Sequence, residues 1–366
     1  MQNNIPELLV SLSGQKIDTL EKWERFRRDE VLNLSEQYAY GVRDIERPEN
    51  LYFKIEEEKE VYGMKLKEVR IGFDDYSFPM HLYLPLKIEK PVPAFVYVMH
   101  ENLENKFQFK EDGNMSSSET MSELPLKHIT DRGYAVAVMP TRDIYREWTT
   151  HSEFKVGVFS AVKIPKGRNK SSWASLSSWA WGVSRVIDYL ETDADVDATR
   201  VASIGHSRSG KAALWAGCTD PRIYLTIANN SGCMGAAILR GKKGEHAKEI
   251  NISDWLNDKF HEYNDCEEYF PIDQHFVLSL VAPRYLCLPS SVLDEWADPE
   301  AELLAAKLTT PVYELYGEKG LVMDDEKPVL NKVYDEGRIV YYVKEGDHSQ
   351  TMFDWNVALD YFDKIK

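Results

Sequence analysis

Short runs of nearly uninterrupted apolar residues recur along this 366-residue chain, and they restrict its possible folds more than any other feature. Such runs are typical of strands buried on both faces of a parallel sheet. They cover residues 94–99, 134–139, 200–204, 224–228, 285–288 and 339–343. Helical segments separate most of them, and the clearest is residues 173–190, where apolar residues recur at helical spacing. This alternation predicts an α/β fold with a mostly parallel central sheet, flanked by helices, and right-handed crossovers.

The first part of the chain has two other patterns. Within residues 17–26, Thr19 precedes acidic residues and apolar residues at helical spacing, which predicts a capped helix. Residues 67–73 alternate between polar and apolar, and residues 80–85 also favour a strand. Alternation is typical of half-exposed antiparallel strands at the edge of a sheet.

No internal repeat, low-complexity tract or Pro/Gly/Ser linker divides the chain. We therefore expect a single domain over residues 1–366, with residues 1–60 as a helical N-terminal extension packed on it. Two polar stretches, residues 101–127 and 239–272, each follow a strand. Loops in this position surround the binding crevice of an open α/β sheet, so we interpret both as walls of a substrate site. Plain surface loops are the alternative.

The acidic balance of the chain limits its partners. Lys and Arg number 44 and Asp and Glu number 60, which gives a net charge of -16. This charge repels phosphate backbones, so we exclude nucleic acid as a partner. No stretch approaches the roughly 18 apolar residues of a membrane span, and the first residues lack the basic and apolar regions of a secretory signal. We expect a cytoplasmic, monomeric protein without membrane contact.

Cysteine and histidine spacings do not indicate a metal or redox site. The four cysteines, Cys218, Cys233, Cys266 and Cys287, show no C-x-x-C spacing. We interpret them as small, mostly buried side chains, with one disulfide as the alternative. No pair of histidines has the H-E-x-x-H spacing either. We therefore expect neither a metal nor another cofactor.

The segment GHSRSGK at residues 205–211 joins an apolar strand to a helix. This arrangement predicts a nucleophile elbow, a strained turn that exposes the hydroxyl of Ser207 above the sheet. The helix N-terminus there favours developing negative charge. The usual G-x-S-x-G pattern is not met, because Ser209 stands where its last glycine would be and Gly210 follows. A turn serine that caps a helix is the alternative for Ser207.

An acid and a histidine follow this serine in the order that α/β-hydrolases use. Asp294 comes soon after the strand at 285–288, and His348 follows the strand at 339–343. We predict that Ser207 is the nucleophile and that His348 takes and returns its proton. Asp294 would orient the imidazole and stabilise its charged form.

Two neighbouring acids, Glu295 and Asp298, stay open as alternatives for this role, and Asp294 is preferred because it lies nearest the strand end. Three other histidines are weaker candidates for a place in the site: His100, His206 and His275.

Several segments together resemble one known family. The elbow GHSRSGKAALW at residues 205–215 is similar to that of the glucuronoyl esterases, family 15 of the carbohydrate esterases, in their bacterial form. The likeness covers most of residues 130–365. The supporting motifs, which agree in order and spacing, are WAWGVSR at 179–185, NNSGCMGAA at 229–237, DQH at 273–275, APR at 282–284, WADP at 296–299 and DH at 347–348.

The resemblance implies an α/β-hydrolase fold and cofactor-free, acyl-enzyme hydrolysis of the ester between 4-O-methyl-glucuronic acid on xylan and an alcohol. It implies that Arg208 contributes to the oxyanion hole, where a guanidinium supplies donors and a fixed charge. It also matches Lys211 to a lysine that contacts the sugar hydroxyls and Trp296 to a tryptophan near the sugar. Glu245 is a looser match to a sugar-contacting position. For Arg208 and Lys211, an ordinary surface residue is the alternative.

The chain departs from the family pattern in two places. Some members carry the triad acid as a glutamate just after the sixth strand, where this chain has Asn230, which cannot be an acid. The resemblance therefore also places the acid after the seventh strand. The second departure is that the first residues lack a secretory signal, although the family's substrate is extracellular. We therefore expect this chain to act on an imported oligosaccharide ester or to have a changed specificity. The alternative functions are an acetyl xylan or other small-ester esterase, and a catalytically silent carbohydrate-binding homologue.

Overall fold

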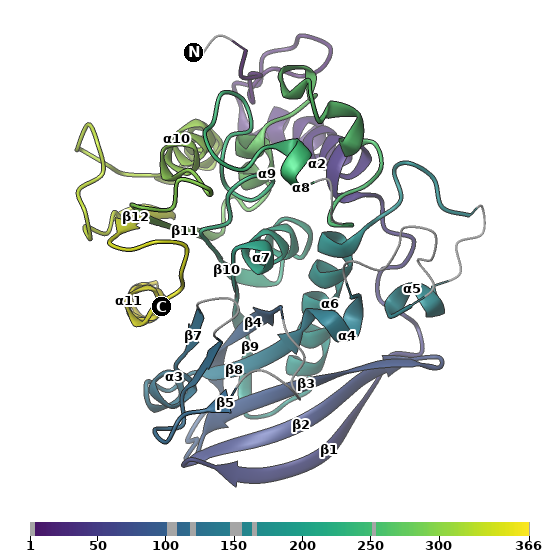
Figure 1. Ribbon diagram of the computed structural model, residues 1–366, viewed down its shortest axis with the longest axis vertical. Coiled ribbons are helices and arrows are strands. Elements are labelled where there is room, and N and C mark those ends of the chain that lie inside the picture. The colour runs from purple at the N-terminus through teal and green to yellow at the C-terminus, as the bar shows by residue number, and fades with distance from the viewer. Residues whose placement is uncertain are drawn as a thin grey trace.

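A computed structural model describes residues 4–100, 108–117, 122–146, 156–162, 167–250 and 254–365. Within these residues, one nine-stranded sheet runs through the molecule and helices lie on both of its faces (Figure 1). The strand order is β1-β2-β3-β8-β4-β9-β10-β11-β12. The bounds are β1 Tyr52–Val61, β2 Met64–Phe73, β3 Tyr76–Pro85, β4 Val92–Met99, β8 Ala135–Pro140, β9 Val196–His206, β10 Ile223–Asn229, β11 Tyr285–Ser291 and β12 Ile339–Lys344.

The sheet has a parallel part and an antiparallel edge. Strands β8, β4, β9, β10, β11 and β12 pair in parallel, whereas β1, β2 and β3 pair in an antiparallel way and β3 joins antiparallel to β8. Each predicted apolar run lies in a parallel strand, except that Tyr134 precedes β8 by one residue. The expected α/β-hydrolase fold, with a mostly parallel sheet flanked by helices, is confirmed. The carboxyl ends of β9 to β12 therefore meet at one edge, where α/β enzymes place their sites.

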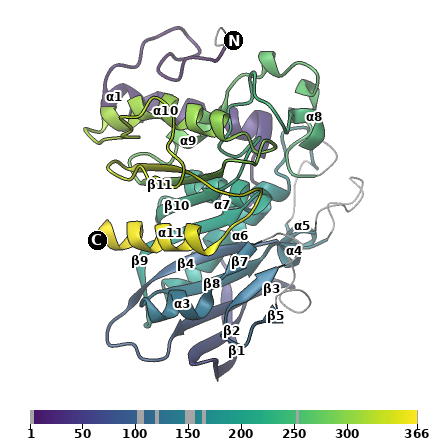
Figure 2. The ribbon, with the colours of Figure 1, turned by 60° about the vertical axis from the view of Figure 1, so that its left-hand side comes forward.

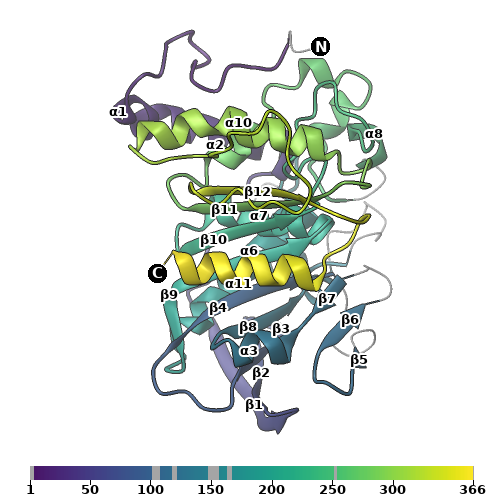
Figure 3. The same cartoon turned by 90° about the vertical axis from the view of Figure 1, so that its left-hand side faces the viewer.

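Two apolar cores cover the two faces of this sheet. Helices α6 (Ser175–Leu190), α7 (Arg208–Thr219) and α10 (Pro299–Leu315) belong to one core. Helices α3 (Leu126–Asp131) and α11 (Met352–Lys364) belong to the other, and α11 lies across its face of the sheet in Figures 2 and 3. A sheet buried on both faces explains why its strands read as unbroken apolar runs.

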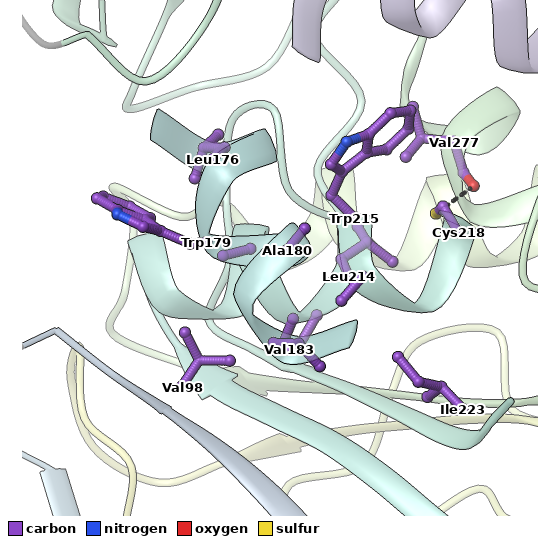
Figure 4. Close-up of a cluster of buried hydrophobic side chains, with 14 of the residues drawn as sticks. Val98, Leu176, Trp179, Ala180, Val183, Leu214, Trp215, Cys218, Ile223 and Val277 are labelled. Atoms are coloured by element: carbon purple, nitrogen blue, oxygen red, sulfur yellow. Dashed lines mark hydrogen bonds between the residues drawn. The ribbon is translucent and has the colours of Figure 1, made fainter. Parts of the chain in front are cut away.

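The contact between α6 and α7 fixes the helix that follows the elbow. All of α6 is buried, and Figure 4 shows its Trp179 above Val98 and, nearby, Leu214 and Trp215 of α7. The indole nitrogen of Trp179 donates to the carbonyl oxygen of Tyr145 over 2.9 Å, so the buried N–H is satisfied. Dense packing of this kind resists small shifts of α7, and with it of the elbow.

A continuous helix over residues 20–40 opens the chain, in the segments α1 (Leu20–Lys22), η1 (Trp23–Arg27), α2 (Arg28–Ser35) and η2 (Glu36–Tyr40). The predicted cap is present, because the backbone N–H of Lys22 donates to Thr19 Oγ1 over 3.3 Å. At the other end, the ring of Tyr40 stacks on Trp215 with centroids 4.0 Å apart. The helix therefore packs against α7 of the main body.

The prediction that residues 1–60 are a helical extension is wrong for their last part. Residues 52–61 form strand β1, which pairs with β2 along its length. This strand is mostly exposed and rich in glutamate. Its conformation is stabilised by hydrogen bonds to the partner strand β2 and not by an apolar pattern of its own. The residues of β1 alone therefore do not indicate a strand.

The two polar stretches contain short elements. Residues 101–127 include a small sheet of β5 (Gln108–Phe109), β6 (Met115–Ser117) and β7 (Ser122–Leu124). Residues 239–272 include α8 (Ala247–Ile250), η4 (Phe260–Tyr263) and η5 (Glu267–Tyr269). Residues 101–107, 118–121 and 251–253 of these stretches lie outside the described residues. Among the residues that the structure describes, the other helices are α4 (Thr141–Ile144), α5 (Val158–Ala161) and α9 (Gln274–Ser279).

All four cysteines are free thiols, so the alternative of a disulfide does not apply. Three of them are buried and Cys266 is half-buried, in line with small side chains that fill the interior. None of the helices in the described ranges combines the length and the hydropathy that a membrane crossing would need.

Candidate active site

Ser207 lies between β9 and α7 with a backbone φ of 57° and ψ of -125°, a strained conformation for a residue other than glycine. Small residues make this turn possible. A Cβ on Gly205 would come within 2.3 Å of the backbone oxygen of Ser209, and one on Gly210 would come within 3.0 Å of the backbone oxygen of Gly205. The close contact between the backbones at residues 205 and 210 thus needs glycine at position 210. This explains how the chain tolerates Ser209 in the usual glycine position. The backbone N–H of Ser207 donates to the carbonyl oxygen of Asn229 on β10.

Asp294 and His348 meet beside this elbow. His348 Nδ1 lies 2.6 Å from Asp294 Oδ2, with the aspartate side chain almost fully buried and the histidine 37% exposed. Burial raises the pKa of Asp294, but hydrogen bonds and the charge of His348 outweigh it, so the pKa stays below its ordinary value. The ring of His348 also lies 4.5 Å from that of His206, the residue next to Ser207. The carboxylate, the imidazole and the serine turn therefore share one corner of the sheet edge.

The two alternative acids lie in other surroundings. Glu295 points to solvent. Asp298 caps α10, because its Oδ1 accepts from the backbone N–H of Ala301 over 3.0 Å. Its Oδ2 accepts from the backbone N–H of Lys243 over 2.6 Å. Of the three acids, only Asp294 contacts His348 among the hydrogen bonds of the described residues.

Two of the weaker histidine candidates serve the fold. His206 Nδ1 is 2.7 Å from Asn229 Oδ1, and burial together with the nearby charge of His348 lowers the pKa of His206 to about 3. His206 therefore stays neutral. His275 Nε2 is 3.0 Å from the carbonyl oxygen of Pro6, and burial lowers its pKa to about 4.

His100 does reach the site, through Arg208. Arg208 Nη1 donates to His100 Nε2 over 3.1 Å, which requires that this nitrogen carry no proton. The guanidinium carbon of Arg208 also lies 5.3 Å from the ring centre of Trp255, within the range of a cation–π contact. Trp255 belongs to the stretch 239–272. The sequence pattern did not indicate Trp255 as a site residue. The one feature that could have pointed to it is that it is an aromatic residue within a charged insertion.

Lys211 is buried one turn into α7. Its Nζ donates to the carbonyl oxygen of Ser231 over 2.8 Å and to Glu245 Oε2 over 2.9 Å. The same Nζ lies 5.5 Å from the ring centre of Trp255. A buried ammonium that is paired and hydrogen-bonded in this way is not an ordinary surface lysine, so that alternative does not describe Lys211.

Trp296 borders this pair from the loop that carries Asp294. Its backbone oxygen accepts from the N–H of Glu245 over 3.0 Å, and its side chain is 51% exposed. The structure thus brings together Lys211, Glu245 and Trp296 from three separate segments. No group of three or more His, Cys, Asp or Glu side chains that could hold a metal ion occurs among the residues that the structure describes.

Comparisons with known proteins identify the family. The family model described as "Glucuronyl esterase, fungi" matches residues 126–317. Carbohydrate esterase MZ0003, from an unknown prokaryotic organism, is 34% identical over 387 residues, which cover 98% of this chain and 89% of that protein. This chain belongs to the glucuronoyl esterase family.

Solved structures agree with this assignment. A glucuronoyl esterase from Solibacter usitatus superposes with a TM-score of 0.86 at 31% identity, covering 98% of this chain and 97% of that one. A promiscuous esterase of carbohydrate esterase family 15 from a marine bacterial metagenome gives 0.84 at 32% identity, with 98% and 96% covered. The resemblance inferred from the sequence is confirmed, and with it the class of carboxylic ester hydrolase.

Proposed function

We propose that this chain hydrolyses the ester between the carboxyl group of a glucuronic acid, on a xylan-derived saccharide, and an alcohol. The observation that carries the proposal is the 2.6 Å contact of His348 Nδ1 with the buried Asp294, beside the strained Ser207 turn. Membership of the glucuronoyl esterase family supports the sugar acid as the substrate.

In the proposed reaction, these three side chains and water carry out the proton transfers and the two attacks on the acyl carbon. Because His348 Nδ1 faces Asp294, its Nε2 is the nitrogen that takes the hydroxyl proton of Ser207 as the oxygen attacks the ester carbonyl. The same proton passes to the departing alcohol, and an acyl-serine forms. Water then gives a proton to His348 and attacks the acyl group. As the bond between the acyl carbon and Ser207 Oγ breaks, His348 returns this proton to Oγ, which releases the sugar acid and restores the serine.

Arg208 would stabilise the negative oxygen of the tetrahedral intermediate. Its backbone N–H lies at the start of α7, directly after the nucleophile, where the helix dipole favours negative charge. Its guanidinium already contacts His100 and Trp255, so the side chain loses less conformational entropy when it binds the negative oxygen. Loss of one donor to such an oxygen costs about 10²-fold to 10³-fold in kcat.

Lys211, Glu245 and Trp296 would bind the sugar. An ammonium has three hydrogens, and within the described part of the chain two of those of Lys211 go to Ser231 and Glu245, which leaves one for a sugar hydroxyl. Glu245 is an acceptor for a second hydroxyl, and the half-exposed ring of Trp296 is an apolar surface for the pyranose.

The test compares turnover of the methyl ester of 4-O-methyl-glucuronic acid with turnover of an aryl acetate. We expect a higher kcat/KM for the glucuronate ester and loss of at least about 10³-fold in Ser207→Ala. A clear preference for the acetate would favour a small-ester esterase instead. Equal, slow hydrolysis by the wild type and by Ser207→Ala would point to a silent sugar-binding protein.

A further inference from the structure

Asn230 binds the same carboxylate oxygen as the histidine of the triad. Its Nδ2 donates to Asp294 Oδ2 over 2.6 Å, the distance that also separates this oxygen from His348 Nδ1. The other oxygen, Asp294 Oδ1, accepts from the backbone N–H of Ala297 over 3.1 Å. A carboxylate held on both oxygens cannot rotate without losing a hydrogen bond, so Asn230 helps to keep it aimed at His348.

The backbone keeps Asn230 in place for this contact. The residue is buried, its N–H donates to the carbonyl oxygen of Pro289 over 2.8 Å, and its φ is 44°. Among residues other than glycine, asparagine and aspartate adopt this left-handed conformation most readily. The side chain therefore leaves the end of β10 in a direction that brings it to the loop after β11.

Lys344, at the end of β12, sets the direction of the amide. Asn230 Oδ1 accepts from Ser291 Oγ over 3.3 Å and faces Lys344 Nζ at 3.5 Å. In the reversed amide, an oxygen would face the carboxylate of Asp294 and an NH2 would face the ammonium, and both contacts repel. The two charges therefore permit one orientation of Asn230.

The same ammonium also holds the segment that carries the histidine. Lys344 Nζ donates to the carbonyl oxygen of Ser349 over 2.7 Å, next to His348, and pairs with Asp354 over 3.0 Å. Both charged side chains are 2% exposed, so the pair is desolvated and geometrically defined. Asp354 is held in turn by the hydroxyl of Tyr342 over 2.8 Å.

We propose that Asn230 is a positioning residue for the Asp294–His348 pair and that Lys344 orients its amide. The proposal rests on the proposed function, because it assigns these two residues a part in the same reaction. It gives a role to a residue that cannot itself be the acid. Three strand ends, those of β10, β11 and β12, thus contribute to the placement of one carboxylate.

The decisive variant is Asn230→Asp, which keeps the size and the left-handed preference but replaces the donor by a second carboxylate. Two carboxylates this close share a proton, so Asp294 loses charge in the variant until the pH is high enough to remove that proton. We expect kcat to fall at least about tenfold at about pH 6 and to recover toward the wild-type value at about pH 9, with KM within about twofold. In the described part of the chain, the charged or titratable groups that interact with this pair or with Asn230 include His206, Lys344 and Glu302, and Asp354 pairs with Lys344. The substitution replaces none of them. Glu302, whose pKa burial raises to about 7, is present in both proteins, so the comparison at each pH is the ratio of variant to wild-type kcat.

A matched control is Asn331→Asp. Asn331 also has a left-handed backbone, with a φ of 62°, and its Oδ1 accepts from the N–H of Glu345 over 3.1 Å. The charge change is the same, but a carboxylate still accepts that hydrogen bond, so we expect kcat within about twofold of the wild type at every pH. Thermal unfolding of both variants shows whether either has lost its fold.

A second arm tests Lys344. We expect Lys344→Met to lower kcat at least about threefold with KM unchanged, and Lys344→Arg to restore most of it, because the charge sets the amide direction. If Lys344→Met does not fold, because Asp354 has lost its partner, the Asn230→Asp profile alone decides. A ratio of variant to wild-type kcat that does not change with pH would overturn the proposal, whether activity is kept or lost. Failure of the wild type on glucuronate esters contradicts the proposed function instead, and it appears before any variant is compared.

Discussion

At the scale of single residues, the site depends on which polar atoms meet at the carboxyl edge of the sheet. Asp294 is buried and contacts His348, whereas Asp298, four residues later, caps a helix. The two aspartates follow the same strand, but their side chains have different hydrogen-bond partners.

This difference predicts that Asp294→Asn lowers kcat by about 10⁴-fold with KM little changed, because an amide would hold the imidazole in the wrong tautomer. In Glu295→Gln and Asp298→Asn, kcat should stay within about threefold of the wild type, since an exposed side chain and a cap are altered instead. Steady-state kinetics on a glucuronate ester measures all three. A loss in either control as large as that in Asp294→Asn would assign the acid elsewhere.

At the scale of elements, α7 matters most, because it begins directly after Ser207, the proposed nucleophile, and packs on β10. The two elements approach so closely that a Cβ on Gly217 would come within 2.1 Å of Thr226 Oγ1. Gly217 is therefore needed for the contact between helix and strand, although alanine would suit an isolated helix better by about 1 kcal/mol.

Gly217→Ala should therefore lower the free energy of unfolding by about 1–3 kcal/mol, through overpacking of a buried contact. Adding Thr226→Ala removes the two nearest atoms, Oγ1 and Cγ2, and leaves Cβ at 2.9 Å, so the double variant should regain part of this loss. Urea unfolding followed by tryptophan fluorescence measures both. If the double variant is no more stable than Gly217→Ala, the close approach is not the cause.

At the scale of the whole molecule, a buried acid makes stability depend on pH. Glu302 of α10 accepts from the N–H of Gly232 over 2.9 Å and from Ser290 Oγ over 2.5 Å. Burial raises its pKa from 4.5 to about 7, against the effect of these hydrogen bonds. The folded protein thus holds this proton more tightly than the unfolded chain, and the stabilisation present below pH 4.5 is lost as the pH rises to about 7.

Glu302→Gln should remove this part of the pH dependence, which amounts to about 3 kcal/mol between the two pKa values. The comparison is the free energy of unfolding at about pH 4.5 and about pH 7.5 in wild type and variant. Glu300→Gln, on the same helix but with an exposed side chain, is the control and should leave the slope unchanged. An unchanged slope in Glu302→Gln would contradict the prediction.

Much of this protein could be predicted from its sequence alone. Apolar runs between helical segments predicted the parallel sheet, because a strand buried on both faces needs apolar side chains throughout. The elbow segment and the order of Ser207, Asp294 and His348 indicated a serine hydrolase, since strand-end positions follow from chain order once the sheet is parallel. The cytoplasmic location and the monomeric state stay predictions.

Only the tertiary structure decided the contacts between segments that are distant along the chain. It placed Asp294 rather than Glu295 or Asp298 against His348, and it paired β1 with β2 where a helical extension was expected. In the sequence, Asn230 was notable only because some family members have a glutamate at this position. In the fold, its side chain donates a hydrogen bond to Asp294. Local patterns record how a segment buries its own side chains, but partners across strand ends depend on how the whole sheet is assembled.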